Sequence, residues 1–111
     1  MLAEVKKGVI GIIGGSGLYD IDGLDNVSWK VIHSPFGLPS DSLMCGRLCG
    51  VDVVFLPRHG RGHVLSPTDI NYRANIDVLK RIGVTDIISV SAVGSFKEEL
   101  APGTFVIVDQ F

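Results

Sequence analysis

The order of apolar and polar positions along the chain predicts several short strands. Stretches rich in Val, Ile or Leu recur along the 111 residues, and segments rich in Gly and Pro separate them, notably SPFGLPSD at 34–41 and PRHGRGH at 57–63. We expect strands at about residues 8–14, 27–33, 42–48, 51–56, 85–91 and 104–109.

One segment has the periodicity of an amphipathic helix, with its charged residues mostly on the opposite face. The positions of its apolar face include Ile70, Ala74, Val78 and Ile82. Ser66 is the predicted N-cap, Pro67 suits the first helical position, and Gly83 is the predicted stop. We expect this helix to pack on a sheet.

The helix lies between two strand segments, so residues 51–91 are predicted to form a βαβ unit. The run VTDIISVSA at 84–92 is nearly continuous in apolar residues, as in parallel strands covered on both faces. The predicted fold class is therefore α/β, a mixed sheet flanked by helices, in a single domain over residues 1–111. Such sheets bind ligands at the carboxyl ends of their strands.

Composition and charge narrow the possible partners. The formal net charge of −2 argues against a nucleic-acid footprint, and no apolar stretch approaches the ~18 residues of a membrane span. Cys45 and Cys49 are too few for a four-ligand zinc site. We expect both to be reduced, partly buried thiols, which favours the cytoplasm.

The first strand runs into GGSGL at 14–18, which does not match three common glycine motifs. A GxGxxG loop would need glycine at Asp20, a P-loop would need GK[ST], and a nucleophile elbow would need glycine at Leu18. A compact turn remains, whose backbone N–H groups and Ser16 hydroxyl can donate to an oxyanion. An ordinary tight turn is the alternative.

The loop after the fourth predicted strand carries Arg58 and His59. An arginine fork can bind a phosphate bidentately, and the neighbouring imidazole can add a donor. A solvated basic turn is the alternative. His59 and His63 are four residues apart, but Gly60 and Gly62 disfavour a metal-binding helix, so we expect no metal.

The loop SAVGS at 91–95 leaves the fifth strand with the Ser91 hydroxyl and the backbone amides of Ala92 and Val93. Small residues there, Gly94 among them, would let a flat base or sugar approach the backbone closely. A buried strand terminus is the alternative. Together the three loops predict one phosphate pocket.

Six segments then show that the sequence resembles the 5′-methylthioadenosine phosphorylases of the purine nucleoside phosphorylase family. In order along the chain these are IGIIGGSGL, SPFGLPSD, LPRHGRGH, SPTDINYRANI, SAVGSFKEEL and PGTFVIVDQF. The resemblance implies a phosphorylase/hydrolase-like fold and a homotrimer. It also implies phosphorolysis of 5′-methylthioadenosine to adenine and 5-methylthioribose 1-phosphate, with phosphate as co-substrate and no cofactor.

The resemblance also implies roles for individual residues. It places the phosphate-binding residues at Ser16, Arg58, His59, Ser91 and Ala92. Residues near the sugar and its 5′ substituent fall on His63 and Pro67, and we extend the substrate-binding set to Val93 and Gly94.

The family's catalytic carboxylate and purine-reading residues have no counterpart here, so no catalytic residue is identifiable. We expect an N-terminal piece of a nucleoside phosphorylase domain, incomplete at the C-terminus and inactive alone. Two alternatives stay open: a phosphorylase of 6-oxopurine nucleosides such as methylthioinosine or inosine, and a catalytically inactive phosphate-binding module.

Overall fold

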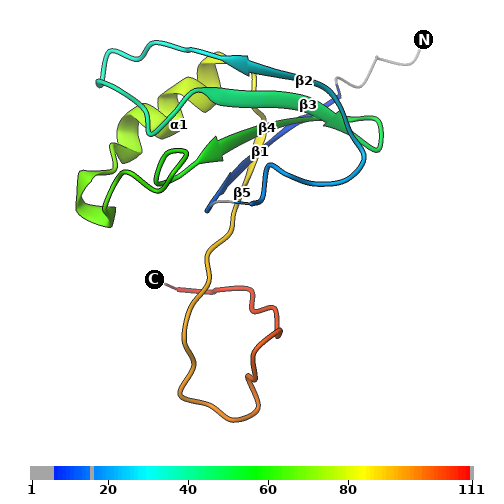
Figure 1. Ribbon diagram of the computed structural model, residues 1–111, viewed down its shortest axis with the longest axis vertical. Helices are drawn as coiled ribbons and strands as arrows, with labels where there is room; N and C mark the ends of the chain where they lie inside the picture. Colours follow the sequence, from blue (N-terminus) through cyan, green and yellow to red (C-terminus); the bar gives the residue numbers. More distant parts are fainter. Residues whose placement is uncertain (1–6, 16, 111) are drawn as a thin grey trace.

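The computed structural model describes residues 7–15 and 17–110, which form a five-stranded mixed sheet with one α-helix on one face (Figure 1). The strands lie in the order β2-β3-β4-β1-β5. Their bounds are β1 Val9–Gly14, β2 Leu24–Lys30, β3 Leu43–Leu48, β4 Val51–Pro57 and β5 Asp86–Ser89. The predicted α/β class and mixed sheet are confirmed.

The sheet divides into a parallel and an antiparallel part. β1 pairs in parallel with both β4 and β5, and β3 pairs antiparallel with β4 and with β2. The turn between β3 and β4 has positive φ at Cys49 and Gly50, 51° and 77°, as a tight two-residue hairpin requires. Cys45 is partly buried as expected, but Cys49 is exposed because it occupies this turn.

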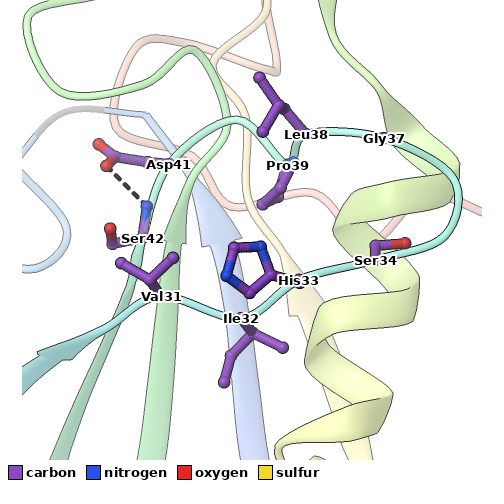
Figure 2. Close-up of a pocket in the computed structure, with 9 residues that line it drawn as sticks. All are labelled: Val31, Ile32, His33, Ser34, Gly37, Leu38, Pro39, Asp41 and Ser42. Atoms are coloured by element: carbon purple, nitrogen blue, oxygen red, sulfur yellow. Dashed lines mark hydrogen bonds between the residues drawn. The ribbon is translucent and has the colours of Figure 1, made fainter.

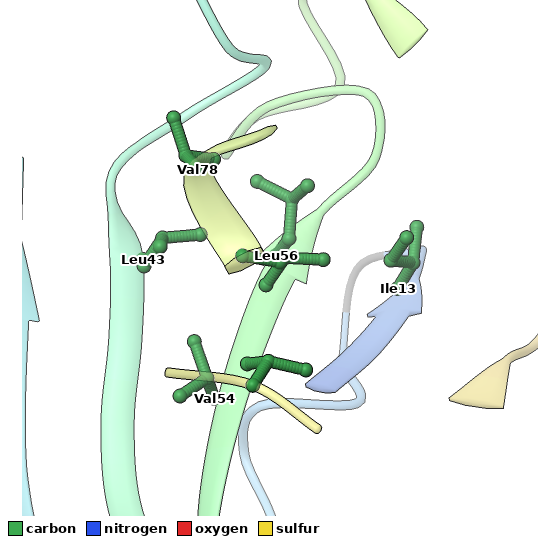
Figure 3. Packing of buried hydrophobic residues seen from close by; sticks show 7 residues of the cluster. Ile13, Leu43, Val54, Leu56 and Val78 are labelled. Atoms are coloured by element: carbon green, nitrogen blue, oxygen red, sulfur yellow. The ribbon is translucent and has the colours of Figure 1, made fainter. Parts of the chain in front are cut away.

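The core lies between the sheet and helix α1 (Tyr72–Arg81). Val78 and Leu79 of the helix pack on apolar side chains from three strands, of which Figure 3 shows Ile13, Leu43, Val54 and Leu56. The other face is covered by a smaller cluster around Phe55, which includes Leu18 and Tyr19 from the loop after β1. β4 is buried along most of its length because it lies in the middle of the sheet.

The helix begins later than the sequence predicts. Residues Pro67–Asp69 form a separate 3₁₀ turn, and Ile70 is extended with ψ 127°, which interrupts the helical path. The N-cap is Asn71, whose Oδ1 accepts from the Ala74 N–H at 3.0 Å, while Ser66 makes no capping bond. The predicted cap at Ser66 is therefore wrong, whereas the stop near Gly83 is confirmed.

Two expectations about the end of the chain are also wrong. β5 is exposed at each of its residues because nothing in the described part of the chain covers it, so it is not a strand buried on both faces. No strand forms at 104–109 because those residues pair with no strand of the described part. In Figure 1 the segment after β5 leaves the sheet and turns back on itself.

Candidate active site

The carboxyl ends of β1, β4 and β5 meet at one edge of the sheet, as the three-loop prediction requires. Gly14 is in register with Pro57, and Val90 donates its N–H to the Ile13 carbonyl at 2.8 Å. The loops that follow these three strands therefore start side by side.

Arg58 ties the three strand ends together. Its backbone N–H donates to the Gly14 carbonyl at 2.9 Å, and its Nη1 donates to the Val90 carbonyl at 3.1 Å. The guanidinium thus lies at the ends of β1 and β5, beside the start of the loop that carries Ser91. The Val90 contact uses one of the five N–H donors of an arginine side chain.

His59 has its tautomer set by the loop. Its Nδ1 lies 2.9 Å from the Leu65 carbonyl, which can only accept, so Nδ1 carries the hydrogen. The Leu65 N–H donates in turn to the His59 carbonyl at 2.9 Å. In the neutral ring Nε2 is therefore an acceptor, suited to a protonated phosphate oxygen. A donation from His59 to phosphate requires the imidazolium form.

The structure brings His63 to the same place but leaves Pro67 further along the chain. The rings of His59 and His63 stack with centroids 4.3 Å apart and an interplanar angle of 24°. His63 has a positive φ of 56°, in a loop whose Gly60 and Gly62 also have positive φ. Pro67 begins the 3₁₀ turn beyond Leu65, and its carbonyl accepts from the Tyr72 hydroxyl at 3.1 Å.

The remaining predicted residues belong to the segments that follow β1 and β5. Ser16 lies outside the described residues, and the neighbouring Gly17 has a φ of 95° within a turn closed by Asp20. Ser91, Ala92, Val93 and Gly94 follow Val90 directly and are all exposed. In the described part of the chain, this segment is connected to Arg58 only through its neighbour Val90, whose carbonyl accepts from the Arg58 side chain.

Two residues next to the candidate site, Asp41 and Arg61, were not identified by the sequence analysis. Arg61 binds the Asp41 carboxylate with three N–H groups, its backbone N–H and its Nε and Nη2. Both lie in quoted motifs, RHGRGH and SPFGLPSD, but no spacing rule pairs two residues 20 positions apart. The pair connects the Arg58 loop to the segment before β3.

Hydrogen bonds from Arg61 perturb the acidity of this carboxylate. Burial by itself would raise the pKa of Asp41, but the donations from Arg61 and Ser42, with the charge of Arg61, hold the pKa below its ordinary value of 3.8. Asp41 is therefore a carboxylate at neutral pH.

A separate pocket of about 420 Å³ lies between the end of β2 and the start of β3 (Figure 2). It is lined by Val31, Ile32, His33, Ser34, Gly37, Leu38, Pro39, Asp41 and Ser42. Its carboxylate disfavours an anion, and Arg58 is not part of its lining, so this pocket is distinct from the sheet edge where phosphate binding is predicted.

Two further findings concern metals and membranes. Within residues 7–15 and 17–110, no group of three or more His, Cys, Asp or Glu side chains is placed to hold a metal ion. Over the same ranges, no helix has the length and apolar character needed to cross a membrane.

Comparison with known proteins places the chain in a family. Residues 9–111 match the model of the phosphorylase superfamily. The chain is 64% identical over 111 residues to S-methyl-5′-thioadenosine phosphorylase of Rhodospirillum rubrum, covering all of this chain and 38% of that protein. It is 66% identical over 105 residues to the Cereibacter sphaeroides protein of the same name, covering 95% of this chain and 36% of the relative.

Solved structures agree with the sequence comparisons. A methylthioadenosine phosphorylase sourced from an antarctic soil metagenomic library superposes with a TM-score of 0.81 at 53% identity, over 86% of this chain and 33% of that one. The Schistosoma mansoni methylthioadenosine phosphorylase in complex with tubercidin gives 0.78 at 46% identity, over 87% and 35%. The predicted resemblance is confirmed, and the chain spans roughly a third of the length of these relatives.

Proposed function

The chain belongs to the phosphorylase superfamily, and we propose that it forms the phosphate-binding edge of an enzyme that cleaves 5′-methylthioadenosine with inorganic phosphate. The products would be adenine and 5-methylthioribose 1-phosphate. The observation that carries the proposal is the position of Arg58, bonded at once to the ends of β1 and β5. The names of the similar proteins support the choice of nucleoside.

The chemistry explains why such an edge is needed. Phosphate forms a bond to C1′ of the sugar while the bond from C1′ to the purine nitrogen breaks, and the bonding electron pair leaves with the base. Positive charge grows on the sugar in the transition state, so a phosphate anion held beneath C1′ both positions the nucleophile and stabilises that charge. No covalent enzyme intermediate is required.

Each loop has a part in holding the anion. Arg58 supplies charge-assisted N–H donors, and the loops carrying Ser16 and Ser91 supply hydroxyl and backbone donors. His59 Nε2 accepts from a monohydrogen phosphate. Two groups would lie toward the sugar: the stacked ring of His63, and the exposed segment of Ala92, Val93 and Gly94. Pro67 would lie further from the phosphate than His63.

The setting of the enzyme is part of the proposal. We infer a homotrimer in the cytoplasm that uses nucleoside and phosphate and no cofactor. The free thiols of Cys45 and Cys49 are compatible with a reducing compartment.

A chimera tests the proposed function. Residues 1–111 would replace the matching stretch of the Rhodospirillum rubrum relative, with which they are 64% identical. We expect phosphate-dependent release of adenine from 5′-methylthioadenosine, and a higher KM for phosphate in the Arg58→Ala chimera. An unchanged phosphate KM would remove Arg58 from this role.

A second candidate is a catalytically inactive phosphate-binding module. It is favoured by the exposure of the chain after β5, where Phe96 and Phe105 are almost fully exposed. Release of adenine from 5′-methylthioadenosine by the 111-residue chain, purified free of host enzyme, would reject the module. A chimera that binds phosphate but releases no adenine would support it.

A further inference from the structure

The carboxylate of Asp41 is held at the centre of a network of four hydrogen bonds. Arg61 donates from its backbone N–H at 2.8 Å, from Nε at 2.9 Å and from Nη2 at 3.0 Å. The Ser42 N–H donates at 2.7 Å, the bond dashed in Figure 2. Only 12% of the Asp41 side chain is exposed, so water competes little for these contacts.

Arg61 is fixed on its other side by aromatic rings. The carbon at the centre of its guanidinium lies 3.9 Å from the centre of the Trp29 ring, a cation–π contact. Trp29 in turn meets Tyr19 edge to face, with centroids 5.8 Å apart. Tyr19 follows the glycine loop after β1, so Arg61 is linked to that loop as well as to Asp41.

Helix α1 anchors the segment that presents Asp41. The buried side chain of Asn75 accepts from the Ser40 N–H at 2.8 Å and donates to the Ser40 hydroxyl at 3.0 Å. A Cβ on Gly60 would lie 3.1 Å from the Ser40 carbonyl oxygen, so the Arg58 loop packs directly on this segment. Gly60 has a φ of 74°, which favours glycine.

We propose that Asp41 is a positioning residue for phosphate, which acts through Arg61 to hold the 58–63 loop in its binding conformation. The inference rests on the proposed phosphate site. The Asp41 carboxylate binds the backbone N–H of Arg61, so it constrains the loop itself as well as a side chain. Arg58 and His59 lie in the same loop. They are the two central residues of the turn that the Gly60 N–H closes by donating to the Pro57 carbonyl.

Whether phosphate affinity rises or falls when Asp41 is replaced separates a positioning role from a purely electrostatic one. A carboxylate near an anion site repels the anion, so replacing Asp41 by Asn should strengthen phosphate binding if only charge matters. If Asp41 instead holds the 58–63 loop in place, the same replacement should weaken phosphate binding. We expect Asp41→Asn to weaken phosphate binding about 10-fold, within the range of coupling between contacting groups.

Titration of the 111-residue chain with inorganic phosphate, followed by calorimetry, tests the inference. The matched control is Asp77→Asn, which removes the Asp77–Arg81 pair on α1 and makes the same change in charge. Its phosphate affinity should stay unchanged or rise slightly.

Two further variants refine the test. Asp41→Glu, which keeps the carboxylate, should bind phosphate more tightly than Asp41→Asn but less tightly than the unmodified chain. The double variant D41N/R61Q should bind no more weakly than the weaker single variant. Circular dichroism at the titration temperature confirms that each variant is folded.

Each result has a distinct meaning. If the unmodified chain binds no phosphate, the KM of the chimera for phosphate replaces the titration for all variants, and a chimera that releases no adenine with phosphate means that the proposed function fails and this inference with it. If the unmodified chain binds phosphate and Asp41→Asn binds equally or more tightly, the positioning role is wrong while the phosphate site stands. If Asp41→Asn unfolds, Asp41→Glu and Arg61→Gln replace it as test variants, and unchanged affinity in both would overturn the role.

Discussion

The guanidinium of Arg58 reaches across the end of β1 and donates from Nη1 to the Val90 carbonyl, 3.1 Å away at the end of β5. Since β1 lies between β4 and β5, and the Arg58 backbone N–H donates to the Gly14 carbonyl, a single residue connects three neighbouring strand ends. The contact holds the guanidinium plane at the edge where the predicted phosphate loops meet.

The Arg58→Lys variant tests whether this planar fork is needed. Lysine keeps the charge but cannot contact Val90 and a phosphate through fixed parallel N–H groups. We expect phosphate binding to weaken about 10-fold or more, the value of one charge-assisted hydrogen bond. Calorimetric titration with phosphate measures it, and Arg73→Lys on the exposed side of α1 is the control. Equal affinities for the Arg58→Lys variant and the unmodified chain would mean that charge alone suffices.

Asn75→Ala tests the anchor between helix α1 and Ser40. The variant leaves the Ser40 N–H without its acceptor, so the free energy of unfolding should fall by about 1–3 kcal/mol. Ser40→Ala should cost less, because the bond from the Ser40 backbone to Asn75 stays in place. Urea unfolding of both variants provides the measurement. If both variants lose the same unfolding free energy, the contact of Asn75 with the Ser40 hydroxyl would be the one that stabilises the fold.

The lowered pKa of Asp41 predicts a pH-dependent contribution to stability. A carboxyl whose folded pKa is depressed stabilises the fold above its unfolded pKa, and this stabilisation is lost as the pH falls through the folded pKa. The difference in unfolding free energy between the unmodified chain and Asp41→Asn should therefore be constant near neutral pH and shrink below the ordinary value of 3.8. Urea unfolding at several pH values measures the difference, and one that grows on acidification would contradict the prediction.

Two phenylalanines test where the core ends. Phe55 is 2% exposed and Phe105 is 98% exposed. Phe55→Ala should lower the free energy of unfolding by about 3–5 kcal/mol, the cost of a cavity in a packed core. Phe105→Ala should change it by less than about 0.5 kcal/mol, as for other surface substitutions. A large loss from Phe105→Ala would show that the segment after β5 packs on the sheet in solution.

The apolar runs of the sequence predicted correctly the strands whose side chains are buried in the sheet. The apolar runs of β1, β3 and β4 place these strands to within a residue or so, because their side chains are buried in the middle of the sheet. The apolar run at 104–109 predicted a strand wrongly, since hydrophobicity indicates a tendency to be buried but not the presence of a pairing partner.

The candidate site could be predicted in part for the same reason. Parallel strands place their carboxyl ends at one edge, so the proximity of Arg58 to the end of β5 followed from topology. The N-cap at Asn71 and the pair of Asp41 with Arg61 could not be predicted. Both depend on contacts between loops: Asn71 Nδ2 also donates to the Phe36 carbonyl at 2.8 Å, and Arg61 folds back on the segment before β3.

The exposure of β5 has a consequence for the order in which the molecule opens. In the described part of the chain β5 is hydrogen-bonded to β1 alone. Its amide protons should therefore exchange with solvent when the strand frays locally, whereas those of β4 should exchange only when the whole molecule unfolds. When β5 frays, the Val90 carbonyl leaves Arg58. The predicted phosphate edge thus joins a central, largely buried strand to an exposed edge strand, and the contact between Arg58 and Val90 lasts only while β5 stays paired with β1.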